Sequence, residues 1–248
     1  MARGEELFGQ GPLQDDVAPL VAAAHELKTP LAVIAYLAAA LRDEVSPLDK
    51  AQQQIYLERI ALSTERMARL VDGFTQAYRL ADERQLSLLG LEPVNVANVM
   101  DEAAHELQPL ASQLDQTIEL NSTSRLSLAV ANRDLLRSVV INLLDNALKH
   151  NPAGSHVRLG VVGRGQYLRA VVKDNGSQLS RHELRALRDQ LGRQLQPLSG
   201  RAQSSGLGLY IAARLTRAMG GKLGVICHPV AGASFYADLQ RSTQLSLL

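Results

Sequence analysis

Apolar residues in the first part of the chain recur at alternating spacings of four and three. Between residues 15 and 45 they form one stripe: Leu20, Ala24, Leu27, Leu31, Ile34, Ala38, Leu41 and Val45. A second stripe consists of Tyr56, Ile60, Ser63, Met67, Leu70, Phe74 and Ala77. This spacing is typical of a heptad seam and predicts two long helices. In the connecting "SPLD", Ser46 is the expected N-cap and Pro47 the first helical residue.

Two long helices joined by a short connection predict an antiparallel hairpin. A single hairpin buries its apolar stripes poorly, so we expect two copies to associate as a dimeric four-helix bundle. The simpler interpretation is a coiled coil with no further role.

The helical period ends in "LSLLGLEPVNV", where Gly90 and Pro93 predict a boundary. Beyond it we expect a helix from Val96 to about Ala111, a strand near "TIEL" and a helix across "RDLLRSVVINLLDNALKH". The alternating segments "HVRLGVVG" and "YLRAVVKD" predict a β-hairpin. Helices are also expected at "RHELRALRDQL" and "GLGLYIAARLTRAMGG", the latter ending at Gly220–Gly221, and strands at "KLGVICH" and "ASFYADLQ".

Helices on one side of antiparallel strands make an α/β two-layer sandwich. The predicted fold class is therefore α+β and multidomain, with a helical hairpin followed by this sandwich. The predicted divisions are 1–14, a disordered lead-in or artificial remnant; 15–86, the hairpin; 87–93, a hinge linker; and 94–248, the sandwich domain.

Composition narrows the class further. The 248 residues carry a formal net charge of +1, which does not indicate the strongly basic surface of a nucleic-acid-binding protein. The single cysteine, Cys227, excludes a disulfide within one chain and fits a reducing compartment such as the cytoplasm. No apolar run is expected to reach the ~20 residues of a membrane span, so any membrane anchor would lie upstream.

Candidate chemistry begins in "AHELKTPLAV", where His25 and Glu26 are adjacent and Pro30 follows inside the helix. A carboxylate near an imidazole can hold one ring nitrogen protonated and leave the other free as a nucleophile. Pro30 removes a backbone donor and can bend the helix near His25. An exposed His–Glu pair with no catalytic role is the alternative for this segment alone.

Three further motifs lie in the second domain. In "NLLDNALKH", Asn142, Asn146 and Lys149 share one helix face, offering hard oxygen ligands for Mg²⁺ and a cation for phosphate. The alternative is that these asparagines only cap the helix or contact solvent.

The segment "VVKDNG" ends a strand at Asp174. A buried carboxylate there requires a partner such as an adenine amino group, although turn chemistry also explains the segment. "SSGLGLYIA" opens a helix, whose free N–H groups favour phosphate.

Taken together, the four motifs resemble bacterial two-component sensor histidine kinases in order and spacing. "HELKTPLAVI" resembles their phospho-acceptor box, "NLLDNALKH" their asparagine box, and "DNG" and "GLGL" their two glycine boxes. The resemblance covers nearly the whole chain after the first fifteen residues. It implies a dimerisation and phospho-acceptor hairpin before a Bergerat-fold ATP-binding domain.

The resemblance also implies roles for individual residues. His25 would accept the γ-phosphoryl group of ATP, Glu26 would act as its general base, and Thr29 would position water for the reverse, phosphatase reaction. Asn146 and Asn142 would hold Mg²⁺. The ATP-binding set would be Asn142, Asn146, Lys149, His150, Asp174, Gly176, Gly206, Leu207, Gly208 and Leu209. The phosphoryl group would then pass to an aspartate in the receiver domain of a response regulator, docked near Ala35, Ala39 and Ala40.

Several positions depart from the family pattern. Gln178 replaces the second glycine of the first glycine box, Ser204 replaces a glycine in the second, and His150 replaces a frequent tyrosine. The lid sequence "ELRALRDQLGRQL" has no aromatic residue. Because these changes restrict the backbone and loosen the lid, we expect weaker nucleotide affinity or slower turnover than in a typical member.

Two other functional classes are alternatives to a kinase, and the departures in the lid favour the first of them. One is a non-catalytic two-component phosphatase or scaffold that binds nucleotide poorly. The other is an ATPase of the gyrase or MutL kind, but those proteins use a glutamate where Asn142 stands and have no His25 hairpin.

Overall fold

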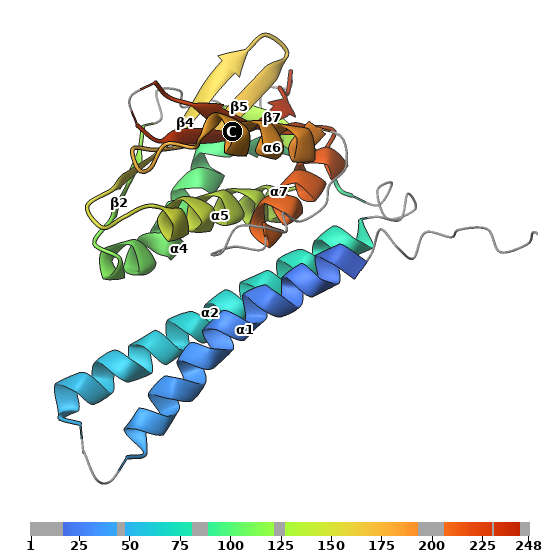
Figure 1. Ribbon diagram of the computed structural model, residues 1–248. Coiled ribbons are helices and arrows are strands. Elements are labelled where there is room, and N and C mark those ends of the chain that lie inside the picture. Colours follow the sequence, from blue (N-terminus) through green and yellow to red (C-terminus); the bar gives the residue numbers. More distant parts are fainter. Residues whose placement is uncertain are drawn as a thin grey trace, which may run out of the picture.

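The structure is a computed structural model that describes residues 17–43, 48–80, 89–121, 127–192, 206–229 and 231–243. Its first part is a hairpin of two helices, α1 (Val17–Leu41) and α2 (Lys50–Arg79), which confirms the prediction (Figure 1). Helix α1 continues through Pro30. The predicted lead-in, residues 1–14, lies outside the described residues.

Helix α2 begins with a capping box built on Asp49. The backbone N–H of Gln52 donates to Asp49 Oδ1 at 2.7 Å, and the backbone N–H of Asp49 donates to Gln52 Oε1 at 3.4 Å. The expectation of Ser46 as N-cap is therefore wrong, since Asp49 satisfies donors of the first turn together with Gln52. Ser46 and Pro47 lie outside the described residues.

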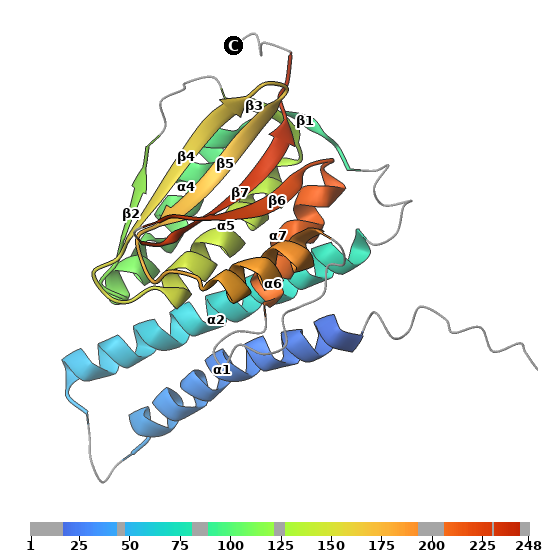
Figure 2. The same cartoon turned by 45° about the horizontal axis from the view of Figure 1, so that its top comes forward.

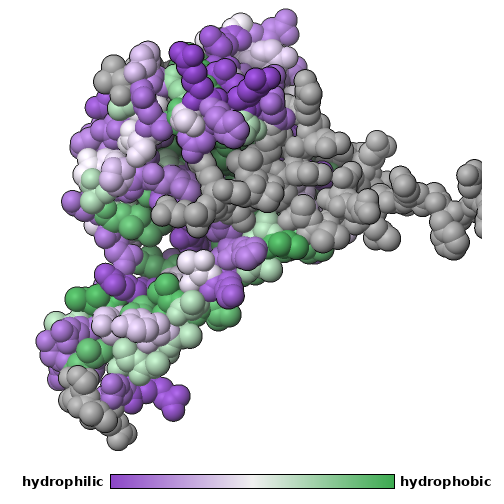
Figure 3. Space-filling model, viewed as in Figure 1, coloured by the Kyte–Doolittle hydropathy of each residue, from purple (hydrophilic) through white to green (hydrophobic). Residues whose placement is uncertain are grey.

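The apolar stripe of α1 is only partly covered within one chain. Leu20 and Leu31 of the predicted seam are 52% and 55% exposed, whereas Leu37, on a neighbouring face, is 4% exposed. Members of the α2 stripe are buried or half-buried. Apolar surface is visible along the hairpin in Figure 3. One hairpin alone therefore leaves part of the seam in contact with solvent.

The segment Pro19–Leu41 is long and apolar enough to pass for a membrane span by length and composition, against the expectation that the chain has no such run. The same helix carries the exposed His25 and packs lengthwise on α2 (Figures 1 and 2).

The second part of the chain is a two-layer sandwich, as predicted. Its five-stranded sheet has the order β2-β4-β5-β7-β6, with strands Thr117–Leu120, His156–Arg164, Tyr167–Asp174, Ala233–Gln240 and Lys222–Cys227 respectively. Helices α4 (Val96–Gln113), α5 (Arg133–His150) and α7 (Leu207–Ala218) cover one face (Figure 2). Helix α6 (Arg181–Gly192) packs near β6.

Two features of the strands differ from the expectations. The pair β2–β4 is parallel, because a crossover through α5 separates these strands, so the expected all-antiparallel sheet is wrong at that edge. A separate two-stranded ribbon, β1 (Glu92–Asn95) with β3 (Leu128–Ala131), was not predicted. Each of these strands has only four residues, too short for a clear alternating pattern.

Helix α5 is the centre of the core. Its fully buried side chains include Leu136, Leu143, Leu144 and Leu148. It packs between α4 and α7 and against the sheet, whose inward residues include Val157, Leu159 and Val172. Because its buried residues leave little freedom to rotate, the polar positions of α5 are fixed in direction.

Helix α2 lies against the helical layer of the sandwich, so the order of layers is sheet, helices, α2 and α1 (Figure 2). Arg66 Nη2 lies 3.0 Å from Asp145 Oδ2 of α5, and Arg69 Nη1 lies 3.6 Å from Glu106 Oε1 of α4. Gly73 is buried, and a Cβ placed on it would lie 3.3 Å from Ile211 Cγ2 of α7. The two domains are therefore docked through both charge and close packing.

Candidate functional site

A cavity of about 340 Å³ lies between α5, α6 and the ends of β5 and β7. We call it the Asp174 cavity. Its lining residues are Asn146, Ala147, His150, Asn151, Asp174, Ser177, Gln178, Leu179, Glu183, Ala233 and Phe235. The volume is within the range of roughly 300–1,000 Å³ usual for small-molecule pockets. The lining combines apolar side chains, among them Leu179 and Phe235, with a larger number of polar ones. Such a mixture can hold a flat ring that also carries hydrogen-bonding groups.

Asp174 is the buried carboxylate of this cavity, 5% exposed at the end of β5. Its Oδ1 accepts from the backbone N–H of Gly176 at 3.1 Å and of Ala233 at 3.3 Å. Burial raises the pKa of the Asp174 carboxyl, while these N–H donors and the Asn151 side chain act in the opposite direction. A buried acceptor of this kind is matched by an amino group such as that of adenine.

Asn151 supports Asp174, although it is not among the site residues that the sequence motifs predict. Its side chain hydrogen-bonds to Asp174 and occupies the space next to Gly176. Gly232 supports the same strand end from the β6–β7 turn, because a Cβ on Gly232 would lie 2.1 Å from the Asp174 carbonyl oxygen. The sequence feature that could have indicated Asn151 is its position directly after the "NLLDNALKH" helix.

Helix α5 directs its predicted site residues toward different surroundings. Asn146 and His150 line the Asp174 cavity. Lys149 instead reaches the hairpin, where Nζ lies 2.8 Å from Glu26 Oε2 and 3.1 Å from Oε1. Asn142 donates from Nδ2 to the Ser138 carbonyl at 2.8 Å and lines a second cavity beside α2.

Asn146 fits Mg²⁺ in kind, since its amide oxygen is a hard ligand and the residue lines the Asp174 cavity. Asn142 is one turn away and faces α2, so the second amide does not share the Asp174 cavity among its described lining residues. Its role as a Mg²⁺ ligand stays a prediction.

The second glycine box begins α7. Gly206 is its N-cap, with φ 69° and ψ 10°, a left-handed conformation that favours glycine. Leu207 and Leu209 are buried in the core. A Cβ on Gly208 would lie 3.3 Å from Asn142 Oδ1, so Gly208 permits the close packing of α7 on α5. Within the described residues, this segment borders Asn142 and does not line the Asp174 cavity.

On the hairpin, His25 and Thr29 are exposed and four residues apart, on one face of α1. The side chain of Glu26 is only 10% exposed, because Lys149 covers it. The structure thus brings the predicted acceptor turn of α1 together with the predicted asparagine-box helix, although the two partners are 123 residues apart.

Gln178, the departure in the first glycine box, has a defined contact. Its Nε2 donates to the carbonyl oxygens of His228 at 3.0 Å and Pro229 at 2.7 Å. The side chain therefore ties the loop after Asp174 to the β6–β7 turn at the wall of the cavity. A glycine at this position would remove both of these hydrogen bonds.

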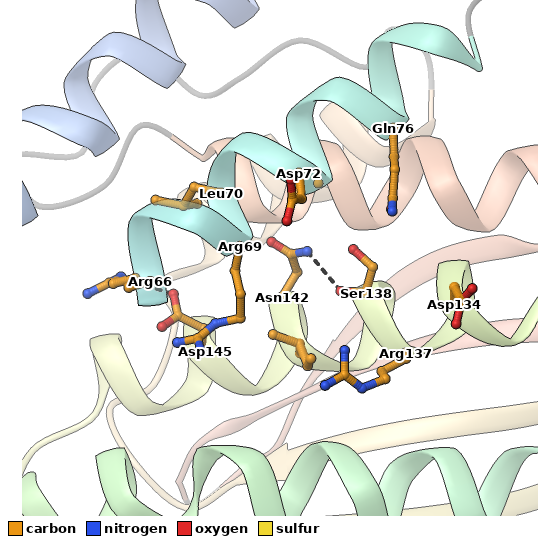
Figure 4. A pocket seen from close by; sticks show the side chains of 12 residues that line it. Arg66, Arg69, Leu70, Asp72, Gln76, Asp134, Arg137, Ser138, Asn142 and Asp145 are labelled. Atoms are coloured by element: carbon orange, nitrogen blue, oxygen red, sulfur yellow. Dashed lines mark hydrogen bonds and ion pairs between the residues drawn. The ribbon is translucent and has the colours of Figure 1, made fainter. Parts of the chain in front are cut away.

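A second cavity, of about 280 Å³, separates α2 from α5, and we call it the interdomain cavity (Figure 4). Arg66, Arg69 and Asp72 border it from α2, and Ser138, Asn142 and Asp145 from α5. It exists only where the hairpin and the sandwich meet.

Two family models match different parts of the chain. Residues 21–83 match the family model described as His Kinase A (phospho-acceptor) domain. Residues 131–243 match the model described as Histidine kinase-, DNA gyrase B-, and HSP90-like ATPase. The chain contains both domains and belongs to the two-component sensor histidine kinases, of which it is a kinase core.

Similar proteins include Sensor protein kinase PmrB of Pseudomonas aeruginosa, 33% identical over 82% of this chain and 41% of that protein. Sensor protein SphS of Synechococcus elongatus is 29% identical over 86% of this chain and 51% of its own length. The chain thus spans about half the length of the curated relatives it matches.

Among solved structures, histidine kinase AdeS of Acinetobacter baumannii has a TM-score of 0.59 at 18% identity, over 88% of this chain and 98% of that one. Full-length ShkA in complex with AMPPNP has a TM-score of 0.59 at 24% identity, over 93% of this chain and 48% of that one. These likenesses show the fold. The predicted family and fold class are confirmed.

Proposed function

We propose that the chain phosphorylates its own His25 from ATP and passes the phosphoryl group to an aspartate of a response-regulator receiver domain. The observation that carries this proposal is the meeting of the two motifs. Glu26, next to the exposed His25, touches Lys149, whose helix also supplies Asn146 to the Asp174 cavity. The helical turn that carries His25 is therefore in contact with the helix that borders the Asp174 cavity.

In this reaction the Asp174 carboxylate accepts a hydrogen bond from the adenine amino group, which orients the nucleotide. Asn146 would hold Mg²⁺, which would neutralise charge on the phosphates. Lys149 supplies a further positive charge. Glu26 accepts a hydrogen bond from the N–H of one imidazole nitrogen of His25, so the other nitrogen attacks the γ-phosphorus while the bond to the β-phosphate oxygen breaks and ADP leaves. The N–H proton passes to Glu26, which thereby acts as the general base.

Similarity to a histidine kinase whose structure includes a response regulator supports a response regulator as the partner of this chain. ThkA in complex with response regulator protein TrrA has a TM-score of 0.58, over 89% of this chain and 60% of that one. Docking would use the exposed Ala35 and Ala39 of α1, whose small side chains permit close helix approach. Thr29, exposed one turn after His25, would position water for removal of the phosphoryl group from the regulator.

The functional unit would be a homodimer in the cytoplasm, where ATP is available. Leu20 and Leu31, more than half exposed in one chain, belong to the stripe that a second hairpin would cover. Any membrane attachment would come through an upstream segment.

The test is incubation with γ-labelled ATP and Mg²⁺, comparing the chain with His25→Gln. Acid-labile, base-stable label on the parent alone supports the kinase. Absence of label from both proteins would favour the non-catalytic phosphatase or scaffold. Release of phosphate at the same rate by both proteins, without label, would favour a simple ATPase.

A further inference from the structure

The ion pair between Lys149 and Glu26 joins two residues that have separate tasks in the proposed reaction. Both carboxylate oxygens lie within hydrogen-bond distance of Nζ, at 2.8 and 3.1 Å. The Glu26 side chain is 10% exposed and that of Lys149 is 24% exposed, so water screens the pair only partly. A cation held in this way neutralises Glu26.

The position of Lys149 on α5 makes a second partner reachable. Its helix neighbours Asn146 and His150 line the Asp174 cavity, while the Lys149 side chain turns away to the hairpin. A lysine is a point charge on a flexible four-carbon stem, so a change of rotamer redirects the ammonium without moving the helix. One ammonium group cannot neutralise Glu26 and a nucleotide phosphate at separate positions at the same time.

We propose that Lys149 is a positioning residue with two exclusive partners: Glu26 when the cavity holds no nucleotide, and a phosphate when it does. This inference rests on the proposed function. In the first state, the base beside His25 is neutralised and the sandwich stays docked on the hairpin. Nucleotide binding withdraws Lys149 from Glu26 at the moment when a phosphoryl donor is present.

A second ion pair stabilises the same docked state without touching the nucleotide residues. Arg66 of α2 and Asp145 of α5 lie 3.0 Å apart, with side chains 26% and 22% exposed. If docking and nucleotide compete for Lys149, then weakening the docked state by any route must raise nucleotide affinity, because linkage is reciprocal. Substitution of Arg66, which lies outside the proposed catalytic residues, should therefore change the affinity for nucleotide.

The experiment measures the Kd of a fluorescent ATP analogue with Mg²⁺ for the complete chain. We expect Arg66→Gln and Glu26→Gln each to bind about three- to tenfold more tightly than the parent, the range of one partly exposed ion pair. The matched control is Arg59→Gln, which removes the same charge from an exposed position of α2 two turns earlier. Its affinity should equal that of the parent.

A double-mutant cycle separates competition from general electrostatics. In a Lys149→Met background, Glu26→Gln should no longer tighten binding, because no shared cation remains. Tightening of equal size in that background, or no tightening in either, overturns the proposal. If the parent binds nucleotide and labels His25, such a result leaves the kinase function standing. Absence of nucleotide binding by the parent would refute both the proposed kinase function and the competition for Lys149.

Discussion

The side chain of Asn151 occupies the space that any side chain on Gly176 would need: a Cβ built on Gly176 lies 1.7 Å from Asn151 Oδ1. Asn151 in turn hydrogen-bonds to Asp174. The glycine of the "DNG" motif is therefore required by a neighbouring amide, and through that amide it fixes the carboxylate of the cavity. Space for a ligand ring is not its only role.

Gly176→Ala should consequently impair both stability and nucleotide binding. The added methyl group displaces Asn151, so we expect a loss of about 1–3 kcal/mol in unfolding free energy, the range for overpacking. ATP affinity should fall by roughly tenfold or more as Asp174 loses its support. Gly163→Ala is the control, since a Cβ there meets nothing within 4 Å. Equal Kd and equal urea midpoints for the two variants would contradict this account.

Asp174→Asn tests the buried carboxylate. Asparagine Oδ1 can still accept hydrogen bonds from the backbone N–H groups of Gly176 and Ala233. The amide nitrogen, however, cannot accept a hydrogen bond from the adenine amino group. We expect ATP affinity to fall by roughly 10- to 100-fold. Because burial raises the pKa of Asp174, the ionised form costs stability at pH 7, so the variant should melt at a higher temperature than the parent.

The same raised pKa predicts a pH dependence. The folded protein binds a proton at Asp174 more readily than the unfolded chain does, so the stability gained by protonation is present at low pH and is lost as pH rises through the folded pKa. Nucleotide affinity should change in the opposite sense and fall as pH drops through that pKa. Calorimetric titrations across pH 4–7, about the range above the usual Asp pKa, should show this fall in the parent and not in Asp174→Asn.

Gln178→Gly restores the glycine that the family pattern leads one to expect. The variant loses two hydrogen bonds to the β6–β7 turn and gains backbone freedom, so unfolding free energy should drop by about 1–2 kcal/mol. The loop after Asp174 then adapts more easily to nucleotide, and we expect ATP affinity to rise severalfold. Gln178→Ala, which loses the bonds but keeps a restricted backbone, should lie between. Unchanged ATP affinity in Gln178→Gly would show that Gln178 is not the cause of weak nucleotide binding.

Ala39→Glu tests the proposed regulator surface. A bulky charge on this exposed position of α1 should reduce phosphotransfer to the regulator by about tenfold or more, since buried unpaired charge is costly at an interface. Autophosphorylation of His25 should be spared. Ala153→Glu, an exposed position in the sandwich domain, provides the same substitution as a control. Equal transfer rates for both variants would place docking on another surface.

The sequence predicted those elements whose period is long and repeated. Helices α1, α2, α4, α5 and α7 follow from their apolar spacing, and β4 and β5 from strict alternation around a turn. Strands β1 and β3 were missed because four residues carry too little pattern. The parallel β2–β4 pair depends on which edge β2 joins, which local spacing does not encode.

For the site, the sequence indicated residue types but not their partners. Asn146 and Asp174 were predicted and share a cavity, yet their roles stay predictions. The contact of Lys149 with Glu26 depends on how two separate domains dock, so no spacing within either motif reveals it. The importance of Asn151 depends on the backbone path at Gly176, which becomes visible only in three dimensions.

Gly73 predicts how the docking itself can be broken. It lies buried on α2, where a Cβ would stand 3.3 Å from Ile211 Cγ2 and 3.7 Å from Ser138 Oγ. Glycine within a helix costs about 1 kcal/mol relative to alanine, so close approach of α7 is the physical reason for its presence.

Gly73→Leu should therefore strengthen the isolated helix but force the sandwich away from the hairpin, because a side chain of that size cannot fit between α2 and α7. Small-angle scattering should show a larger radius of gyration than in the parent. Thr75→Leu, exposed two residues later on α2, is the matched control and should leave the radius unchanged. If Gly73→Leu scatters like the parent, then α2 does not dock on α7 in solution. The Lys149–Glu26 contact would then need another arrangement of the two domains.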